Sequence, residues 1–282
     1  MPEQKIFSLR AALTKFVEAT QTQSQEHIRP LHWHIVSRLV VEGGFRPEHI
    51  APTPPFRIEA VQGGQRWRLI FDENAARDNE QTVLGGIKTK NVDVVISTKD
   101  IGPCLAVSVK GSTNAFRNLT NRMEEAVGDC TNLHLSYPAL VYGFLHVVRA
   151  NTEKDARKPN DIVVFADGSI SDGIQRYHDS MARLTRRLDV RDEPSRYETV
   201  ALALVNTAKA TRGTLMENYP LQDSSLLFEN FFPALYRTYD LRFVYAAPAM
   251  KSITQRLEWD AESPAFSMPE LATFSPRIVD TE

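Results

Sequence analysis

The sequence is poor in cysteine and in net charge, and each shortage excludes a class of protein. It has two cysteines in 282 residues, Cys104 and Cys130, and no C-x-x-C pair. A disulfide scaffold and a cysteine-rich zinc site are therefore not expected, and reduced thiols fit a cytoplasmic protein. The formal net charge of −2 excludes a basic surface over the whole molecule, although it is compatible with one local basic cleft.

Long apolar runs are also missing. The N-terminal stretch MPEQKIFSLRAALTKF lacks the apolar core of a signal peptide, and no later run is long enough to cross a bilayer. We therefore expect no membrane partner. The chain has 42% apolar and 24% charged residues, as in ordinary globular proteins, and shows no internal repeat. We expect a single domain over residues 1–258 and an irregular, proline-containing tail over 259–282.

The hydrophobic residues are spaced in two ways. Helical spacing over residues 8–42 predicts two N-terminal helices, the first with Ser8 as its N-cap and the second ending at Gly43 and Gly44. His32 and His34 in the second helix are two positions apart, so their side chains point in different directions and we interpret them as surface or capping residues.

Alternating or continuous apolar runs predict the strands. A β-hairpin is expected around Gly63 and Gly64, and further strands at 91–97, 104–110, 139–148, 198–206 and 241–247. Residues 161–167 are expected to form a short strand or an extended segment. Helices are expected at about 113–133, 172–190 and 225–239. Helices, an antiparallel meander, a crossover helix and further strands together predict an α/β fold, a mixed central sheet flanked by helices on both faces.

The run CLAVSVK ends on a lysine, and this residue is the most informative in the sequence. Ser108 and Lys110 share one face of their strand because side chains alternate. A two-residue loop before the strand would place Asp93 of the preceding strand opposite Lys110, and a four-residue loop would place it opposite Ser108. Both loops bring the aspartate to the face of the lysine. A three-residue loop with a bulge would break this relationship.

The helix that follows adds a second acid. One polar stripe of this helix contains Glu124, which can face Asp93, and its other members are Thr113, Arg117, Thr120 and Thr131. Two converging carboxylates form a hard-oxygen site suited to Mg²⁺, with Mn²⁺ as a substitute. A lysine beside this metal could orient a water or stabilise charge on a phosphate, as the hydrolysis of a phosphodiester bond requires.

These residues resemble the PD-(D/E)xK nucleases, which include many type II restriction endonucleases. The resemblance covers about residues 85–150. It is greatest to the restriction enzymes that cut CCGG-related sites. Their motif is S-x-K, and their second acid comes from the following helix, with thirteen residues between it and the lysine. Here the motif is SVK, and thirteen residues separate Lys110 from Glu124.

The resemblance implies a restriction-endonuclease-like core at about residues 56–150, flanked by N-terminal helices (8–42) and by C-terminal strands and helices (160–250). It implies a Mg²⁺-dependent homodimer that cuts double-stranded DNA. Asp93, Glu124 and the carbonyl of Val109 would hold the metal, Lys110 would be the catalytic lysine, and Ser108 would stand where the second acid usually lies. Further candidates are Glu125 as the alternative to Glu124, and Glu26 or Glu42 as a ligand of a second metal.

Several side chains are candidates for contacts with DNA. Arg117, Asn118 and Arg122 follow the catalytic strand, in a neighbourhood that contacts bases in the resembled subgroup. Arg183 and Arg187 belong to a basic helix that could follow phosphates, although a solvated charged face also explains such a run.

Two alternatives remain open at the level of the sequence. The chain could be a nuclease of the same fold that acts in DNA repair or phage defence. It could also be a DNA-binding or scaffold protein without catalytic activity, in which Asp93 and Lys110 form a cross-strand ion pair.

Overall fold

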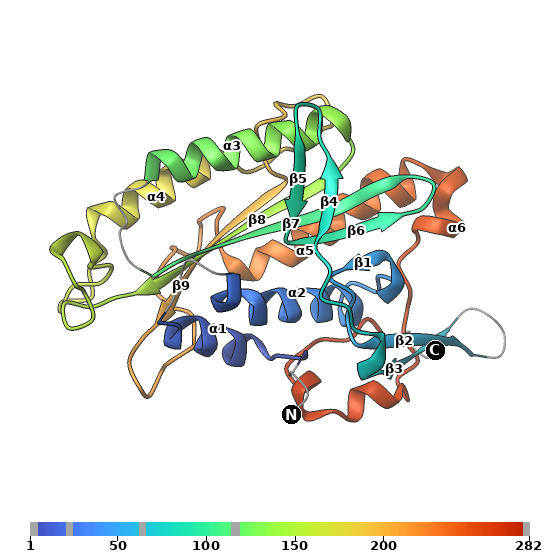
Figure 1. Ribbon diagram of the computed structural model, residues 1–282, viewed down its shortest axis with the longest axis horizontal. Coiled ribbons are helices and arrows are strands. Elements are labelled where there is room, and N and C mark those ends of the chain that lie inside the picture. Colours follow the sequence, from blue (N-terminus) through green and yellow to red (C-terminus); the bar gives the residue numbers. More distant parts are fainter. Residues whose placement is uncertain (1–4, 21–24, 62–65, 114–118, 279–282) are drawn as a thin grey trace.

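A five-stranded mixed sheet lies at the centre of the computed structural model, which describes residues 5–20, 25–61, 66–113 and 119–278 (Figure 1). The strand order is β1-β6-β7-β8-β9. The pairs β1–β6 and β6–β7 are antiparallel, whereas β7–β8 and β8–β9 are parallel. The strands are β1 (Ile50–Ala51), β6 (Val94–Thr98), β7 (Gly102–Ser112), β8 (Val141–Ala150) and β9 (Thr199–Asn206).

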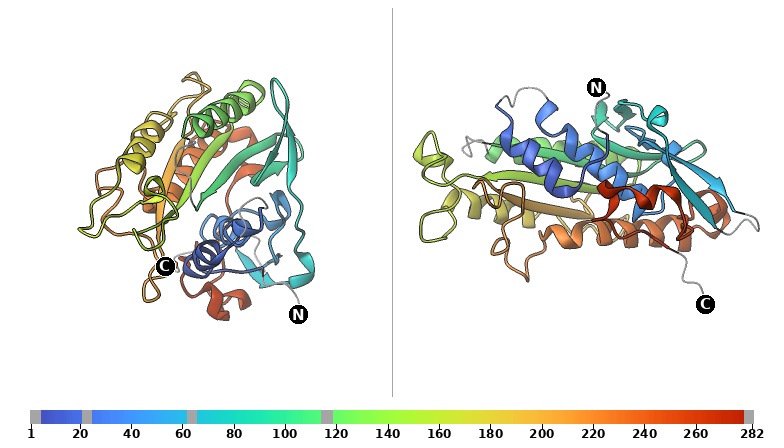
Figure 2. Two further views of the ribbon diagram at one scale, coloured as in Figure 1. Left: turned by 60° about the vertical axis from the view of Figure 1, so that its left-hand side comes forward. Right: turned by 90° about the horizontal axis from the view of Figure 1, so that it is seen from below.

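Helices cover both faces of this sheet (Figure 2), which confirms the predicted α/β fold. One apolar core joins the sheet to α1 (Leu9–Glu18), α2 (Arg29–Val41) and α5 (Phe228–Tyr239). A second core joins the other face to α3 (Leu119–Ser136) and α4 (Asp172–Ala182). The strands are apolar on both sides because both faces are covered.

Two smaller hairpins extend from the sheet. The predicted hairpin is confirmed as β2 (Phe56–Ala60) paired with β3 (Trp67–Phe71). A second hairpin pairs β4 (Gln81–Leu84) with β5 (Thr89–Val92), and its first strand was not expected from the sequence.

The connection between β6 and β7 determines which side chains share a face. Thr98 pairs with Gly102, so the loop has three residues, the length that together with a bulge was expected to separate Asp93 from the lysine. The ladder also contains a bulge after Ile96, beyond which Val94 pairs with Val107. The odd loop and the single extra residue of the bulge cancel, because each alone reverses the alternation. The register therefore places Asp93 opposite Ser108, and the expectation that a three-residue loop with a bulge would separate it from the lysine is wrong.

The predicted N-terminal helices are confirmed. Ser8 caps α1 by accepting a hydrogen bond from the backbone N–H of Ala11. The turn after α2 has Gly44 at a φ of 67°, a conformation that glycine adopts without the strain of a β-carbon.

The interpretation of His32 and His34 as surface residues is wrong, because both are only 4% exposed. Helix α2 is buried on nearly all sides, and the C-terminal segment covers part of it. Within that segment, the indole N–H of Trp259 donates to the carbonyl oxygens of Val40 and Val41. The ring of Phe274 lies 5.2 Å from that of His34. Residues 259–278 are irregular, as expected, but they complete the core and do not form a separate tail.

Two other predicted elements differ from the structure. Residues 240–245 are not a strand but continue α5 as a π-helical turn, with Leu241 and Tyr245 exposed. Residues 161–167 form no regular strand and contain one isolated bridge, from Val164 to Ile170, which fits the extended segment expected as the alternative. Helix α4 ends at Ala182 and does not extend to 190. Within the described ranges, no helix combines the length and the hydropathy that a membrane span requires.

Candidate active site

The carboxylate of Asp93 is fixed against strand β7. Its Oδ2 accepts a hydrogen bond from the backbone N–H of Val109 at 2.7 Å and one from the hydroxyl of Ser108 at 3.1 Å. The β6–β7 ladder stops at the pair of Val94 and Val107, so the backbone N–H of Val109 has no partner in the backbone of β6. The carboxylate of Asp93 accepts this hydrogen bond instead. Because N–H and C=O of one residue point to the same side of a strand, the Val109 carbonyl also faces this open edge.

Lys110 lies on the same face of β7 and reaches helix α3. Its Nζ is 3.0 Å from Oε1 of Glu125, and the other oxygen of this carboxylate is 3.6 Å from the guanidinium of Arg122. Burial acts to raise the pKa of Glu125, but the ammonium of Lys110 and the charge of Arg122 outweigh it and hold that pKa below its ordinary value. The ion pair therefore places a fixed positive charge on the face of the sheet that carries Asp93.

The structure brings Glu125, and not Glu124, to the lysine. Glu124 is exposed, and no ion pair joins it to another described residue. The reason is how α3 docks on the β4–β5 hairpin. Asp129 pairs with Lys90, and the side chain of Asn132 accepts hydrogen bonds from the backbone N–H groups of the hairpin turn. Glu125 lies four residues before Asp129 and so shares its side of the helix, whereas Glu124 is rotated away by about 100°.

Glu80 is an acid of this site that sequence reasoning missed. Gln81 pairs with Val92 in the β4–β5 ladder, so the register places Glu80 opposite Asp93. The side chain of Glu80 is exposed, yet the protein around it desolvates the carboxyl group. This desolvation and then the negative charge of Asp93 raise the pKa of Glu80, and Arg29 and Lys110 oppose the shift only in part. The signal in the sequence was two short alternating runs around Gly85 and Gly86, which together predict a hairpin.

His32 of α2 lies near the carboxylates of Asp93 and Asp78. Burial lowers the pKa of its imidazole, although the charges of Asp93 and Asp78 act to raise it. Its Nε2 is buried and has no hydrogen-bond partner among the described residues. Asp78 is held at the surface by Arg29, 2.9 Å away. The imidazole of His32 is therefore neutral where it lies beside Asp93. We call the site formed by Asp93, Glu80 and the carbonyl of Val109 the acidic edge.

The donors at this edge fit Mg²⁺ in one binding mode. Among the described residues, no group of three or more His, Cys, Asp or Glu side chains converges as a metal cage. The edge instead offers the carboxylates of Asp93 and Glu80 and the carbonyl of Val109, all hard oxygens. Mg²⁺ is commonly held by one or two carboxylates and completes its shell with water and substrate phosphate. Desolvation and, after it, the negative charge of Asp93 raise the pKa of Glu80, so a cation bound between the two carboxylates would lower this pKa again.

Neither N-terminal candidate for a second metal has a contact with Asp93 or Glu80 among those of the described residues. Glu26 is exposed in the short 3-10 turn before α2. Glu42 follows the last turn of α2 and accepts a hydrogen bond from Arg38 at 2.6 Å. It is ten residues from His32, or about 15 Å along the helix. The structure does not bring Glu42 to Asp93.

The predicted DNA-contacting side chains have different positions. Arg122 joins the site through Glu125, and Arg183 is exposed at the end of α4. Arg117 and Asn118 lie outside the described residues.

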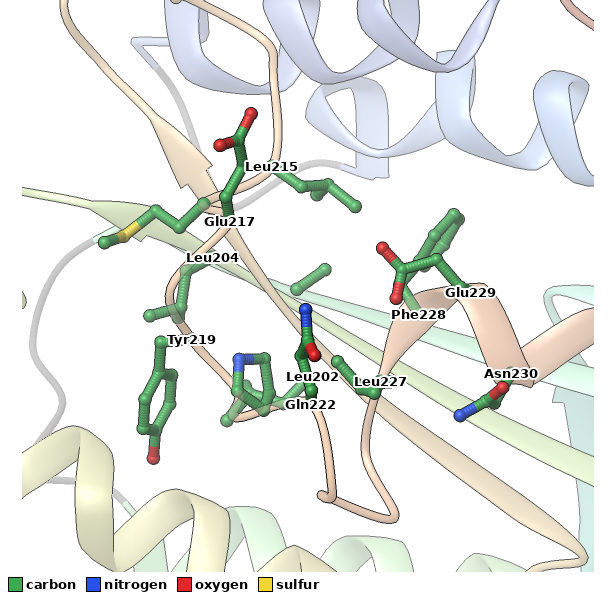
Figure 3. A pocket seen from close by; sticks show the side chains of 13 residues that line it. Leu202, Leu204, Leu215, Glu217, Tyr219, Gln222, Leu227, Phe228, Glu229 and Asn230 are labelled. Carbon is green, nitrogen blue, oxygen red and sulfur yellow. The ribbon is translucent and has the colours of Figure 1, made fainter.

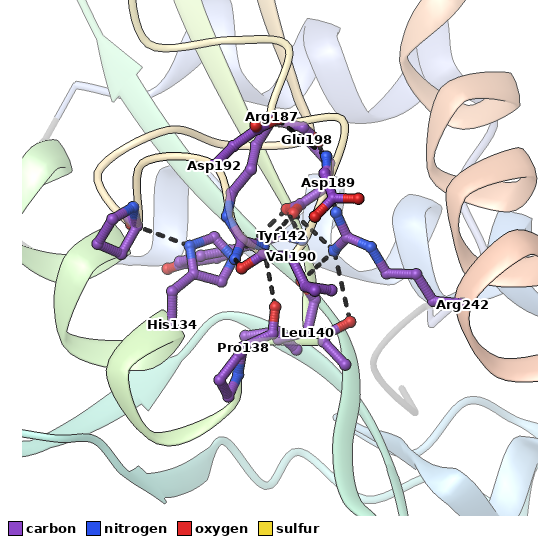
Figure 4. A network of polar contacts seen from close by, with 12 residues as sticks. His134, Pro138, Leu140, Tyr142, Arg187, Asp189, Val190, Asp192, Glu198 and Arg242 are labelled. Carbon is purple, nitrogen blue, oxygen red and sulfur yellow. Dashed lines mark hydrogen bonds and ion pairs between the residues drawn. The ribbon is translucent and has the colours of Figure 1, made fainter. Parts of the chain in front are cut away.

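The prediction for Arg187 is wrong, because this side chain is 2% exposed and has no surface to offer a phosphate. Its guanidinium lies 2.9 Å from Oε1 of Glu198, which Arg242 also contacts at 2.7 Å (Figure 4). The other carboxylate oxygen of Glu198 accepts a hydrogen bond from the backbone N–H of Tyr142. These bonds give Arg187 a structural role, because a buried charge requires such partners.

No protein-family model, no curated protein and no solved structure matches the chain.

Proposed function

We propose that the chain is a metal-dependent nuclease with a restriction-endonuclease-like core. It hydrolyses phosphodiester bonds of double-stranded DNA and acts as a homodimer, in the manner of a type II restriction enzyme. The observation that carries the proposal is the placement of Asp93. Its carboxylate is fixed by Ser108 and Val109 on the face of the sheet where Lys110 stands.

Mg²⁺ would be held by Asp93, Glu80 and the carbonyl of Val109. When bound, it supplies a Lewis acid for the phosphate and lowers the pKa of a bound water. The protein holds the two carboxylates near each other, and desolvation together with the charge of Asp93 raises the pKa of Glu80. The hydrogen bonds from Ser108 and Val109 fix the orientation of Asp93 before any substrate arrives.

Lys110 would act on the phosphate or on the attacking water. Its ammonium has three donors, of which one goes to Glu125 at 3.0 Å. The remaining donors can reach a phosphate oxygen or a water, and so stabilise the charge that develops during in-line attack. Glu125 keeps the lysine in place and is therefore a positioning residue.

The rival explanation is that Lys110 and Glu125 form a structural ion pair in a protein without catalytic activity. Digestion of plasmid and phage DNA with Mg²⁺ separates the two, with Lys110→Ala as the test variant. Lys99→Ala is the matched control, because Lys99 is exposed in the loop at the other end of β7.

Discrete fragments with the wild type and the control, but not with Lys110→Ala, support the site-specific nuclease. A smear that disappears in Lys110→Ala keeps the nuclease and rejects a restriction-type specificity. DNA left intact by folded wild-type protein contradicts the proposal.

A further inference from the structure

A polar pocket separate from the Asp93 site lies at the carboxyl ends of the parallel strands. It has a volume of about 390 Å³, and we call it the arginine pocket. Its polar lining consists of Arg149, Arg157, Arg212, Thr113, Thr20 and Glu18. None of these residues belongs to the Asp93 site.

Each strand of the parallel part of the sheet leads into this pocket. Thr113 follows β7 directly, Arg149 is the last residue but one of β8, and Arg212 lies in the loop after β9. The carbonyl of Thr113 is held by the side-chain amide of Asn151 at 2.7 Å. Helix α1 runs past the same end of the sheet (Figure 1). Open α/β sheets bind their ligands outside the carboxyl ends of the strands, so the position alone favours a binding site.

The charges of the arginine pocket are not balanced. Glu18 is the one carboxylate in its described lining, and it is paired with Arg212 at 3.1 Å. Asp155 acts on Arg149 from nearby, but its carboxylate already accepts hydrogen bonds from two threonines. Arg157 is exposed, and the Nε of Arg149 is buried without a hydrogen-bond partner among the described residues. The pocket therefore presents donors and positive charge that lack an acceptor.

Another pocket of equal volume has an acidic and apolar lining, and comparison with it shows that positive charge is particular to the arginine pocket. It lies beside β9, and its lining includes Glu217 and Glu229 with the apolar side chains of Leu204 and Phe228 (Figure 3). It contains no arginine or lysine in its described lining. Of the two, the arginine pocket alone has the charge that attracts an anion.

We propose that the arginine pocket binds a phosphate group of the nucleic-acid substrate. Guanidinium groups match phosphate oxygens in pairs, which makes arginine well suited to this ligand. Thr113 directly follows β7 and lies three residues beyond Lys110, about 10 Å farther along the direction of the strand. A nucleic-acid strand that passes Lys110 and continues around the carboxyl end of the sheet can contact the pocket as well. This assignment of the ligand rests on the proposed nuclease function.

The pocket can be tested without any nuclease activity. The midpoint of thermal unfolding of the full chain is measured in inorganic phosphate and in chloride at equal ionic strength. Phosphate should raise the midpoint of the wild type above that in chloride, because a ligand of the folded state stabilises it. The increase should be smaller for Arg157→Ala, an exposed side chain whose removal leaves the core intact, and for Arg149→Met, which keeps the bulk of the half-buried side chain.

Arg191→Ala is the matched control. Its side chain is 88% exposed and precedes β9, at the opposite end of the sheet from the arginine pocket. It should respond to phosphate as the wild type does. An equal response in all four proteins, or no response beyond chloride in the wild type, overturns the phosphate site.

A second readout assigns the phosphate to nucleic acid. DNA binding is measured against salt concentration in the Lys110→Ala background, where the DNA stays intact. Adding Arg157→Ala should reduce the slope of log affinity against log salt by about 1, and adding Arg191→Ala should not change it. An unchanged slope with Arg157→Ala overturns the assignment, even if the wild type cuts DNA.

The two proposals fail separately. If phosphate stabilises the wild type more than Arg157→Ala but no nucleic acid is cut or bound, the anion site stands and the nuclease proposal fails. Suppose instead that DNA is cut, but that Arg157→Ala changes neither the increase of the thermal midpoint in phosphate nor the salt slope of DNA binding. The nuclease proposal then stands and the pocket proposal fails.

Discussion

Glu80 faces Asp93 across the β4–β5 hairpin, one position beyond the pair of Gln81 and Val92. Two carboxylates at opposed positions of neighbouring strands destabilise a sheet unless something positive lies between or beside them. Here Lys110 and Arg29 supply part of that charge, and the pKa of Glu80 is still raised. An arrangement that costs stability in the free protein is characteristic of sites that bind a ligand.

Glu80→Gln should stabilise the metal-free protein at neutral pH and reduce cutting on the order of 100-fold. A carboxyl group whose pKa is raised in the folded state binds more protons folded than unfolded. It therefore lowers stability as the pH rises through and above the ordinary value of 4.5. Urea unfolding in EDTA should show that the stability of Glu80→Gln relative to the wild type is greater at pH 7 than at pH 4. Equal losses in both proteins would contradict the raised pKa.

Glu125→Gln should reduce cutting by about 10-fold to 100-fold, because Lys110 loses the charge that positions it. Glu124→Gln is the matched control at the neighbouring, exposed position and should cut as the wild type does. Initial rates of cleavage on a defined DNA fragment measure both. The reverse result would return the second acid to Glu124, the residue that the sequence motif indicates.

Asp93→Asn and Asp93→Ala should both abolish cutting but differ in stability. The asparagine side chain can still accept the N–H of Val109, whereas alanine leaves that buried donor without a partner. An unsatisfied buried group costs about 1–3 kcal/mol, so the free energy of unfolding should be lower for Asp93→Ala by about that amount. Urea denaturation of the three proteins measures it. Equal stability of the two variants would mean that Asp93 does not support β7.

Arg187→Ala should destabilise the fold by about 3–5 kcal/mol, because it leaves Glu198 buried with part of its charge unpaired. Arg183→Ala, an exposed neighbour on the same segment, should change stability by less than about 0.5 kcal/mol. Chemical denaturation compares the two. A stable Arg187→Ala protein with weakened DNA binding would instead restore the surface role predicted from the basic helix.

The protein should lose stability when the pH falls below about 6.5, the ordinary pKa of histidine. Burial lowers the pKa of His34 to about 4 and that of His146 to about 3. The unfolded chain therefore binds protons that the folded one excludes, and each such histidine lowers the free energy of unfolding by about 1.4 kcal/mol per pH unit between these values. Urea unfolding at pH 7, 6 and 5 measures the slope. His34→Gln should reduce the slope by the contribution of one proton, and an unchanged slope would show that His34 is not excluded from protonation.

Local rules predicted the strand face of this site but not its neighbours. Alternation alone places Ser108 and Lys110 together, and Asp93 joins them because the loop and the bulge compensate each other. The choice between Glu124 and Glu125 depends on how α3 rotates when it docks on the hairpin through Asp129. That contact joins segments distant in sequence, so helical periodicity alone does not determine it.

The burial of charged and titratable residues was the other part that periodicity could not predict. Arg187 lies in a basic run that resembles a solvated face, yet its partner Glu198 comes from the segment leading into β9. His32 lies on a helix with an evident apolar stripe, but the C-terminal segment and the acidic edge cover its other sides. A sequence pattern records one face of a helix and does not show what packs against the rest.

The contact between Trp259 and the end of α2 has a consequence for the synthesis of the protein. The indole bonds to the carbonyls of Val40 and Val41, and Phe274 closes the core over His34. A ribosome has therefore made the first helices, the hairpins and the whole central sheet before the residues that enclose α2 emerge. The N-terminal helices must wait in a partly exposed state through most of translation, and the native core can close only after residue 274 is free.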